Sequence, residues 1–379
     1  MRRSAIRRDW LFAISLIAAA CNRTPAGRFV QPSIPTGQTV RVAGFPDYLN
    51  KSVVESFQTK TSNQVIVETY RTNEELSERL AKGVRYDLVF PSSYVAEQLI
   101  SRGLLQPMVR ERVPNLVNVP VQFRNPPYDP SMQYCIPYAW SLLGLGVIRQ
   151  REVRGRDPDR WSELFSLKPR GQEAPTQVVM LDDMRATIGV TLRSLGYSAS
   201  TRSREELMAA QQLLLAQLPR VQNYVEDPAV PISKNQVPLA LSWSTEIFDL
   251  MRHRSDVRFV LPREGTLLYV DHGCVLKGAE HPEVAFALLN HLLDPFSAAE
   301  TTNANMLATA NQEGRRMLDI EARWMWGMFE SVTARAGTYE ILRDVGPAQP
   351  LYDDVWRTVK AALAAQNAQN AKAAAPAGP

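Results

Sequence analysis

The sequence predicts an α/β protein, and three observations lead to this prediction. Strand-like and helix-like segments alternate along residues 40–106, the order that builds a sheet flanked by helices. Residues 86–94 read as an apolar strand that stops at Pro91 and passes directly into a helix. The chain has 379 residues, 45% of them hydrophobic, so it can bury a large core and form more than one lobe.

The first half of the chain supports this class element by element. Thr72 and Glu75 have the spacing of a capping box, which predicts that a helix begins there and ends near Gly83. An earlier helix follows the first strand and places Val53 and Phe57 on one face. Three strands are expected, at residues 40–43, 65–67 and 88–90.

The second half repeats the alternation. Asp183 follows an apolar strand and is a good helix N-cap, and Gly196 ends the helix that it begins. Residues 107–130 between the halves are irregular and rich in proline. Further strands are expected at residues 178–181, 237–242, 257–260 and 267–270, and a helix at 281–293.

Polar and aromatic residues follow the predicted strands at their carboxyl ends. In an α/β sheet such ends face the crevice in which ligands bind, and the backbone N–H groups of the next helix point into it. Ser92 and Tyr94 lie at one of these junctions. We therefore expect both side chains to face a ligand.

These junction residues also carry a family resemblance. Tyr-Asp-Leu-Val-x-Pro-Ser-Ser-Tyr at residues 86–94, with Leu-Ile-Ser-Arg-Gly-Leu-Leu-Gln-Pro at 99–107, resembles the periplasmic spermidine/putrescine-binding proteins of ABC importers. The likeness extends from about residue 40 to about residue 360. It implies the two-lobed periplasmic-binding-protein fold of type II, in which each lobe is a mixed sheet flanked by helices and a hinge joins the lobes.

The resemblance also divides the chain. The implied hinge crossings lie near residues 142–146 and 271–276, with a last crossing near 306–311. Residues 363–379 read as a low-complexity tail that frays. The implied lobe one comprises residues 39–142 and 277–311, and lobe two comprises 143–276 and 312–362.

The resemblance implies a polyamine site. A polyamine carries separated ammonium groups on an apolar chain, so its site needs carboxylates for the charges and aromatic faces for the methylenes. The residues carried over are the aromatic Phe45, Tyr48, Tyr94, Trp243 and Tyr269, the acidic Asp183, Glu246 and Asp271, and the polar anchor Ser92.

Several of these residues have simpler interpretations. Phe45 and Tyr48 fit a core position at a strand end, and Asp183 fits a helix cap alone. Trp243 and Tyr269 fit ordinary packing aromatics. An ionised carboxylate beside an apolar strand needs a partner, however, which makes a purely structural role harder to accept for Asp271 than for the others.

The chain also departs from the family pattern. Phe45 and Tyr269 stand where Trp is common, and Ala186 stands where some members have Glu. Arg343 lies in a region where the family can offer an amide, and a cation there would repel the ligand if it pointed inward. The ligand can therefore be a shorter diamine, a monoamine or an amino-acid-like solute.

The N-terminus reads as an export signal. Four arginines precede an apolar run at residues 11–20 that is too short to span a bilayer. Ile-Ala-Ala-Ala-Cys at residues 17–21 resembles a lipobox, which implies lipidation of Cys21 and a membrane-anchored periplasmic lipoprotein; simple cleavage to an unanchored protein is the alternative. Residues 22–38 read as a flexible tether. The pair Arg7 and Arg8 fits either twin-arginine or ordinary export.

If Cys21 is lipidated, Cys135 and Cys274 remain as an even pair in an oxidising compartment. Both fall in segments that the resemblance places near the lobe junction, where a disulfide can form. Buried free thiols are the alternative, which we favour at this stage because cysteine packs as a small hydrophobe.

Other function classes receive less support. The net charge of +4 is spread without long runs of one sign, which gives no reason to expect nucleic acid as a partner. The chain has no G-x-S-x-G, Walker, H-E-x-x-H or C-x-x-C motif, so we expect neither catalysis nor a cofactor. We expect a monomer that binds an amine ligand and interacts with ABC permease subunits. Ferric iron held by tyrosines and His272, or a role as a solute sensor, remain rivals.

Overall fold

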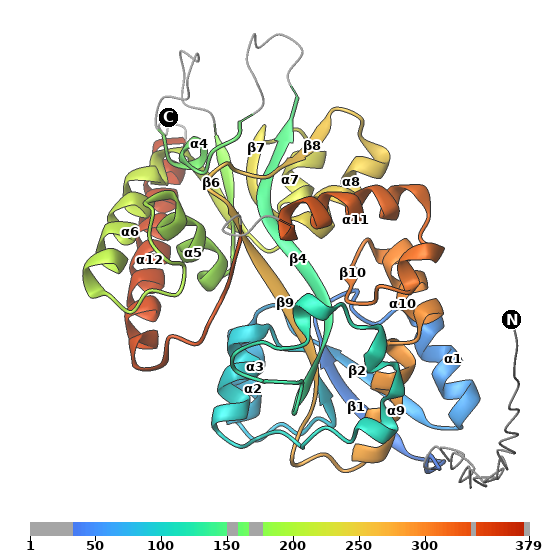
Figure 1. The fold of residues 1–379 in the computed structure, drawn as a ribbon. Helices are drawn as coiled ribbons and strands as arrows, with labels where there is room; N and C mark the ends of the chain where they lie inside the picture. Colours follow the sequence, from blue (N-terminus) through green and yellow to red (C-terminus); the bar gives the residue numbers. More distant parts are fainter. Residues whose placement is uncertain (1–32, 150–157, 167–176, 335–338, 375–379) are drawn as a thin grey trace, which may run out of the picture. The chain divides into compact units, whose positions relative to one another are not determined.

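Two long antiparallel strands run through the middle of the sheet (Figure 1). They are β4 (Cys135–Ile148) and β9 (Thr266–Val275), and both are buried along almost their whole length. The computed structural model describes residues 33–149, 158–166, 177–334 and 339–374. The export signal, Cys21 and most of the tether lie outside the described residues.

Six further strands extend the sheet on both sides of this central pair, in the order β2-β1-β3-β9-β4-β7-β5-β6, while β8 and β10 pair with β4 and β11 pairs with β9. At one end β1 pairs in parallel with β2 and β3, and at the other β5 pairs in parallel with β6 and β7. We call these the β1–β3 end and the β5–β7 end. The other strands are β1 (Thr39–Gly44), β2 (Gln64–Thr69), β3 (Leu88–Val89), β5 (Val178–Leu181), β6 (Val221–Val225), β7 (Leu239–Trp243), β8 (Val257–Val260), β10 (Ala308–Thr309) and β11 (Tyr339–Ile341).

Helices cover both faces of the sheet (Figure 1). Among the described residues no helix combines the length and the apolar character that crossing a membrane requires. The helices are α1 (Lys51–Thr61), α2 (Asn73–Ala81), α3 (Ser93–Ser101), α4 (Ser162–Phe165), α5 (Met184–Ser194), α6 (Arg204–Gln217), α7 (Ala229–Ser233), α8 (Ser244–His253), α9 (Pro282–Leu292), α10 (Pro295–Asn305), α11 (Ile320–Thr333) and α12 (Gln349–Ala374).

Both predicted N-caps form, although the Glu75 carboxylate accepts from the backbone N–H of Arg71 at 2.8 Å instead of that of Thr72, its partner in a capping box. The Thr72 side chain accepts a hydrogen bond from the backbone N–H of Glu75 at 3.2 Å, and the Asp183 carboxylate accepts one from Ala186 at 2.7 Å. Each cap satisfies a backbone donor that the first helical turn leaves open. The caps fix where α2 and α5 begin and therefore where Asn73 and Asp183 stand.

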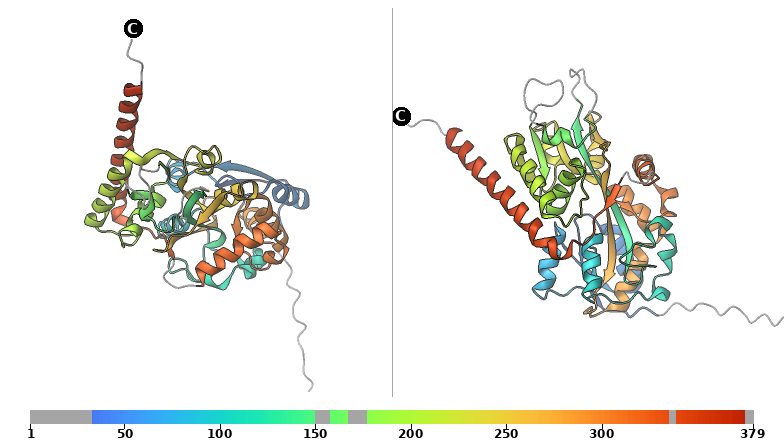
Figure 2. Two further views of the ribbon diagram at one scale, coloured as in Figure 1. Left: turned by 90° about the horizontal axis from the view of Figure 1, so that it is seen from above. Right: turned by 60° about the vertical axis from the view of Figure 1, so that its left-hand side comes forward.

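The C-terminal segment differs from its prediction. We expect the segment after residue 362 to fray, but α12 continues to Ala374 (Figure 2). Alanine and glutamine are strong helix formers, so once α12 is anchored on α5 and α6 the low-complexity sequence extends it.

The structure also corrects the prediction of free thiols. Cys135 and Cys274 are directly opposite each other on β4 and β9 and form a disulfide. Their Cα atoms are 4.5 Å apart, the spacing of a non-hydrogen-bonded antiparallel pair and within the range that a disulfide requires.

Candidate functional site

A cavity of about 740 Å³ lies where the strands of both ends of the sheet finish. Its walls come from residues that follow the carboxyl ends of β1, β3, β5, β6 and β7, together with the middle of β9. Within each end of the sheet the parallel strands finish side by side, and the two groups run in opposite directions, so their carboxyl ends face each other across the middle of β4 and β9. Eight of the nine predicted ligand residues line it: Phe45, Tyr48, Ser92, Asp183, Trp243, Glu246, Tyr269 and Asp271.

Tyr94 is the exception, and the prediction that its side chain faces the same cavity is wrong. Its hydroxyl donates to Glu74 at 3.0 Å, and the Arg185 guanidinium lies 4.7 Å from its ring centre. Ser92 and Tyr94 are two residues apart at the start of a helix, about 200° around the axis, so they cannot point in the same direction. Tyr94 therefore packs against α5.

Asp271 is the most constrained acid in the cavity. The Ser92 hydroxyl donates to its Oδ1 at 2.5 Å, and the Tyr48 hydroxyl donates to its Oδ2. Asn73 fixes Ser92 in turn by donating to its hydroxyl at 2.9 Å and accepting from its N–H at 2.9 Å. Ser92 is the N-cap residue of α3, but its side chain makes no capping bond because it serves Asp271 instead. Burial raises the pKa of Asp271 to about 6, although both hydroxyls favour the ionised form.

Two aromatic rings form a corner next to this acid. Trp243 and Tyr269 are T-shaped, with ring centroids 4.5 Å apart. Tyr269 and Asp271 are two residues apart on β9, so both side chains lie on the same face of the sheet. The Tyr269 hydroxyl is buried and has no hydrogen-bond partner among the described residues. It can therefore bond to a guest in the cavity.

Glu246 contributes a second carboxylate from the first turn of α8. Its Oε2 atom is buried and finds no hydrogen-bond partner in the described part of the chain. Burial raises the pKa of Glu246 to about 8, and the negative charges of Asp227 and Asp47 contribute to the increase. A carboxyl group in this position is suited to a positively charged guest, because a cation would supply the partner that it lacks.

Asp183 is both a helix cap and part of the cavity wall. Burial, followed by the charge of Glu74, raises its pKa to about 7, while the bond from Ala186 and the nearby Arg185 act in the opposite direction. One carboxylate oxygen of Asp183 thus caps the N-terminus of α5, and the side chain still lines the cavity.

Four further acids in the lining were missed by the sequence analysis: Asp47, Glu226, Asp227 and Asp249. Glu226 and Asp227 follow β6 directly, so the rule that strand ends meet would have found them if β6 had been predicted. Arg71, which follows β2, forms an ion pair with Glu226 and so connects opposite ends of the sheet at the cavity.

Two residues with expected roles lie outside the lining. His272 is buried, and its Nε2 lies 3.2 Å from the Tyr128 hydroxyl. Arg343 makes a bidentate ion pair with Glu97 and does not point into the cavity. Among the described residues no group of three His, Cys, Asp or Glu side chains is arranged to hold a metal ion.

Comparison with known proteins agrees with this architecture. The family model described as bacterial extracellular solute-binding protein matches residues 52–321. The spermidine/putrescine-binding periplasmic protein of Salmonella typhimurium is 28% identical over 327 residues, covering 85% of this chain and 92% of that one. The putrescine/cadaverine-binding protein of Pseudomonas aeruginosa is 26% identical, with 83% of this chain and 91% of that one covered.

A solved structure, a putative spermidine/putrescine ABC transporter from Listeria monocytogenes, superimposes with a TM-score of 0.78 at 24% identity. The match covers 85% of this chain and 98% of that chain, which confirms the periplasmic-binding-protein fold. The family is extracytoplasmic and its members bind solutes. This chain therefore belongs to the bacterial extracellular solute-binding protein family.

Proposed function

We propose that this protein captures a short polyamine of the putrescine or spermidine type and delivers it to an ABC importer. The observation that carries the proposal is the charge of the cavity. Seven acidic residues line it, whereas the basic residues among the described lining are Arg71, already paired with Glu226, and His253. Similar proteins named for binding spermidine, putrescine or cadaverine support the same ligand class.

The proposed contacts divide the ligand into charged ends and an apolar middle. One ammonium binds Asp271, which Ser92 and Tyr48 hold in place. The methylene chain lies against the corner of Trp243 and Tyr269. A second ammonium binds Glu246. A charge-assisted hydrogen bond contributes roughly 1.5–3 kcal/mol and a cation–π contact roughly 0.5–2 kcal/mol, so the acids determine most of the affinity.

Transport then depends on closure of the two proposed lobes. The cavity takes Ser92 and Tyr48 from the β1–β3 end and Asp183 and Glu246 from the β5–β7 end. A ligand that contacts both ends favours the closed arrangement by its difference in affinity for the two states. The closed surface is what the permease recognises, and no catalytic step is involved.

Other solutes fit the same fold. Ala186 in place of a carboxylate leaves room for a monoamine or an amino-acid-like solute at the Asp183 end. Ferric iron is less favoured, because His272 lies outside the lining and bonds to Tyr128. A sensor that docks on a receptor would use the same ligand site, and only the partner protein would differ.

The ligand class is tested by thermal shift and titration calorimetry with putrescine, cadaverine, spermidine, γ-aminobutyrate and ferric citrate. We expect one or more of the polyamines to raise the melting temperature, and Asp271→Asn to remove that shift while the ligand-free protein stays folded. Asp256→Asn, on the α8–β8 loop and outside the cavity lining, is the matched control and should keep the shift. Stabilisation by another solute but by no amine would end the polyamine proposal.

We also propose lipidation of Cys21 and attachment of the mature protein to the membrane through the tether at residues 22–38. We expect Cys21→Ser to move the protein from the membrane fraction to the soluble extracytoplasmic fraction. An unchanged distribution between the two fractions would contradict the anchor.

A further inference from the structure

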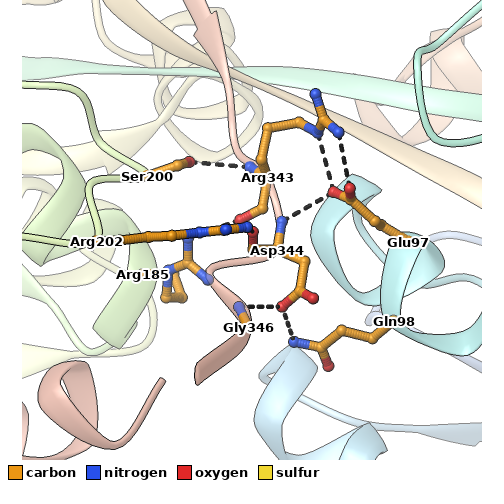
Figure 3. Close-up of polar contacts among 8 residues, drawn as sticks. All are labelled: Glu97, Gln98, Arg185, Ser200, Arg202, Arg343, Asp344 and Gly346. Carbon is orange, nitrogen blue, oxygen red and sulfur yellow. Dashed lines mark hydrogen bonds and ion pairs between the residues drawn. The ribbon is translucent and has the colours of Figure 1, made fainter. Parts of the chain in front are cut away.

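Residues 342–346 belong to the connection between β11 and α12 and lie between side chains from both ends of the sheet (Figure 3). Before this connection, β11 pairs in parallel with β9, from Tyr339 opposite Thr266 to Ile341 opposite Leu268. The chain then passes α3, which follows β3, before entering α12, which packs on α5 and α6. It is thus a further link between the two ends, additional to β4 and β9.

On the α3 side, the connection is held by several hydrogen bonds. The Arg343 guanidinium donates to both oxygens of Glu97, at 2.9 and 2.7 Å, and the backbone N–H of Asp344 donates to the same carboxylate at 2.9 Å. The Gln98 amide donates to the Asp344 carboxylate at 2.9 Å, and the N–H of Gly346 donates to the same oxygen at 3.0 Å.

On the opposite side, residues that follow β5 hold the same backbone (Figure 3). The Ser200 hydroxyl accepts from the N–H of Arg343 at 3.0 Å. Arg185 donates to the carbonyl of Arg343 at 3.1 Å, and Arg202 donates to the carbonyl of Asp344 at 3.2 Å. Residues 343 and 344 are therefore fixed from both ends of the sheet at once.

Arg185 connects this contact with the cavity. It is fully buried, with its guanidinium 4.7 Å from the ring centre of Tyr94 on α3 and 4.8 Å from that of Tyr352 on α12. It lies two residues after Asp183, whose carboxylate lines the cavity. The same arginine thus touches α3, α12 and the connection, and stands on the helix that presents Asp183.

We propose that Arg185 and Arg343 form a clamp that holds the 342–346 connection to α3 and so sets how readily the two ends of the sheet adopt the ligand-binding arrangement. In this arrangement the cavity is lined from both ends, so the clamp favours the state that binds. Neither arginine touches the ligand; both are positioning residues. The inference rests on the proposed closure over an amine.

Loosening the clamp should weaken binding without altering any ligand contact. If only a fraction of the molecules keeps the competent arrangement, the apparent Kd rises by the inverse of that fraction. The Arg343 side chain is 42% exposed and that of Glu97 21% exposed, so solvent weakens this ion pair. The bidentate geometry of the pair strengthens it, as does the hydrogen bond from the backbone N–H of Asp344 to the same Glu97 carboxylate. We expect Arg343→Met and Glu97→Gln each to raise the Kd for putrescine roughly three- to tenfold.

The first experiment is a double-mutant cycle on this pair, with putrescine kinetics by stopped flow. We expect each single variant to lower the association rate more than it changes the dissociation rate, because fewer ligand-free molecules hold the competent arrangement. The double variant should be little worse than either single one. Arg254→Met is the matched control, because Arg254 makes a similar bidentate pair with Asp256, at 2.7 and 2.6 Å, within one loop of the β5–β7 end. It should leave both rates unchanged.

The second experiment needs no ligand and so separates the clamp from the identity of the guest. Hydrogen exchange in the ligand-free protein should be faster at the amides of Asp344 and Gly346 in Arg343→Met and Glu97→Gln than in wild type. Unchanged exchange at these amides would refute the clamp even if putrescine binds. Faster exchange with unchanged ligand kinetics would refute its control of closure. If no amine binds at all, faster exchange would still support the clamp, and the proposed function would fail independently.

Discussion

Glu246 illustrates at the residue scale how a binding site opposes stability. Its buried Oε2 has no partner among the described residues, and burial raises its pKa to about 8. A charged group that is removed from water without a partner destabilises the unliganded protein. A bound ammonium supplies that partner and so offsets the desolvation cost. The same side chain should therefore act in opposite directions on ligand-free stability and on affinity.

We predict that Glu246→Gln raises the melting temperature of the ligand-free protein and raises the Kd for putrescine roughly 10- to 150-fold, the equivalent of a hydrogen bond to a charged group at about 1.5–3 kcal/mol. Differential scanning fluorimetry and calorimetry measure the two effects. Asp249→Asn is the comparison, since Asp249 lines the cavity but is exposed. It should change neither quantity by as much. A destabilised variant that still binds tightly would remove Glu246 from the site.

Most of the candidate site could be predicted because its polar and aromatic residues stand directly after predicted strands, where an α/β sheet places its ligand site. Phe45 and Ser92 follow β1 and β3, whose parallel pairing places them side by side, and Trp243 ends β7, which runs in the opposite direction and finishes at the middle of β4. The sequence reveals all three strands, and the strand ends are where an α/β sheet binds ligands. Tyr94 was misplaced because helical phase, not position in a motif, decides where a side chain points. Glu226 was missed because β6 is an edge strand of mixed polarity, which gives a weak periodic signal.

At the element scale, the pairing of β4 with β9 is reinforced covalently. The disulfide between Cys135 and Cys274 closes a loop with a sequence separation of 139 residues. The sequence could not show this pairing, because it depends on the register of two strands far apart in the chain. The loop-entropy model assigns about 5 kcal/mol to a loop of this size, and measured losses on removing native disulfides are about 2–5 kcal/mol.

We predict that Cys135→Ala with Cys274→Ala lowers the free energy of unfolding by about 2–5 kcal/mol. Urea denaturation followed by circular dichroism measures this difference. Wild-type protein unfolded in excess reductant should show a comparable loss, while the double variant should be indifferent to the reductant. Equal midpoints for oxidised and reduced wild type would mean that the bond does not contribute to stability.

At the scale of the whole molecule, three carboxyl groups of the cavity link folding and binding to pH. Burial, the largest cause in each case, raises the pKa of Asp271 to about 6, of Asp183 to about 7 and of Glu246 to about 8. In the unfolded chain such groups titrate near pH 4. Between about pH 4 and 8 these three groups therefore hold more protons in the folded protein than in the unfolded chain, so their contribution lowers the free energy of unfolding as the pH rises. Burial lowers the pKa of His272 to about 4, which opposes this trend up to about pH 6.5.

A bound diamine reverses this balance, because its ammonium groups favour ionised carboxyls and lower their pKa values. We predict that the melting temperature of the ligand-free protein falls from pH 5 to pH 8, that the stabilisation by putrescine grows over the same range, and that binding near pH 7 releases protons. Calorimetry in buffers of different ionisation enthalpy measures the release.

Glu246→Gln should reduce this proton release most, since this carboxyl has the highest pKa of the three. A binding enthalpy independent of the buffer, with an affinity that does not change from pH 5 to pH 8, would mean that these carboxyls do not meet the cation.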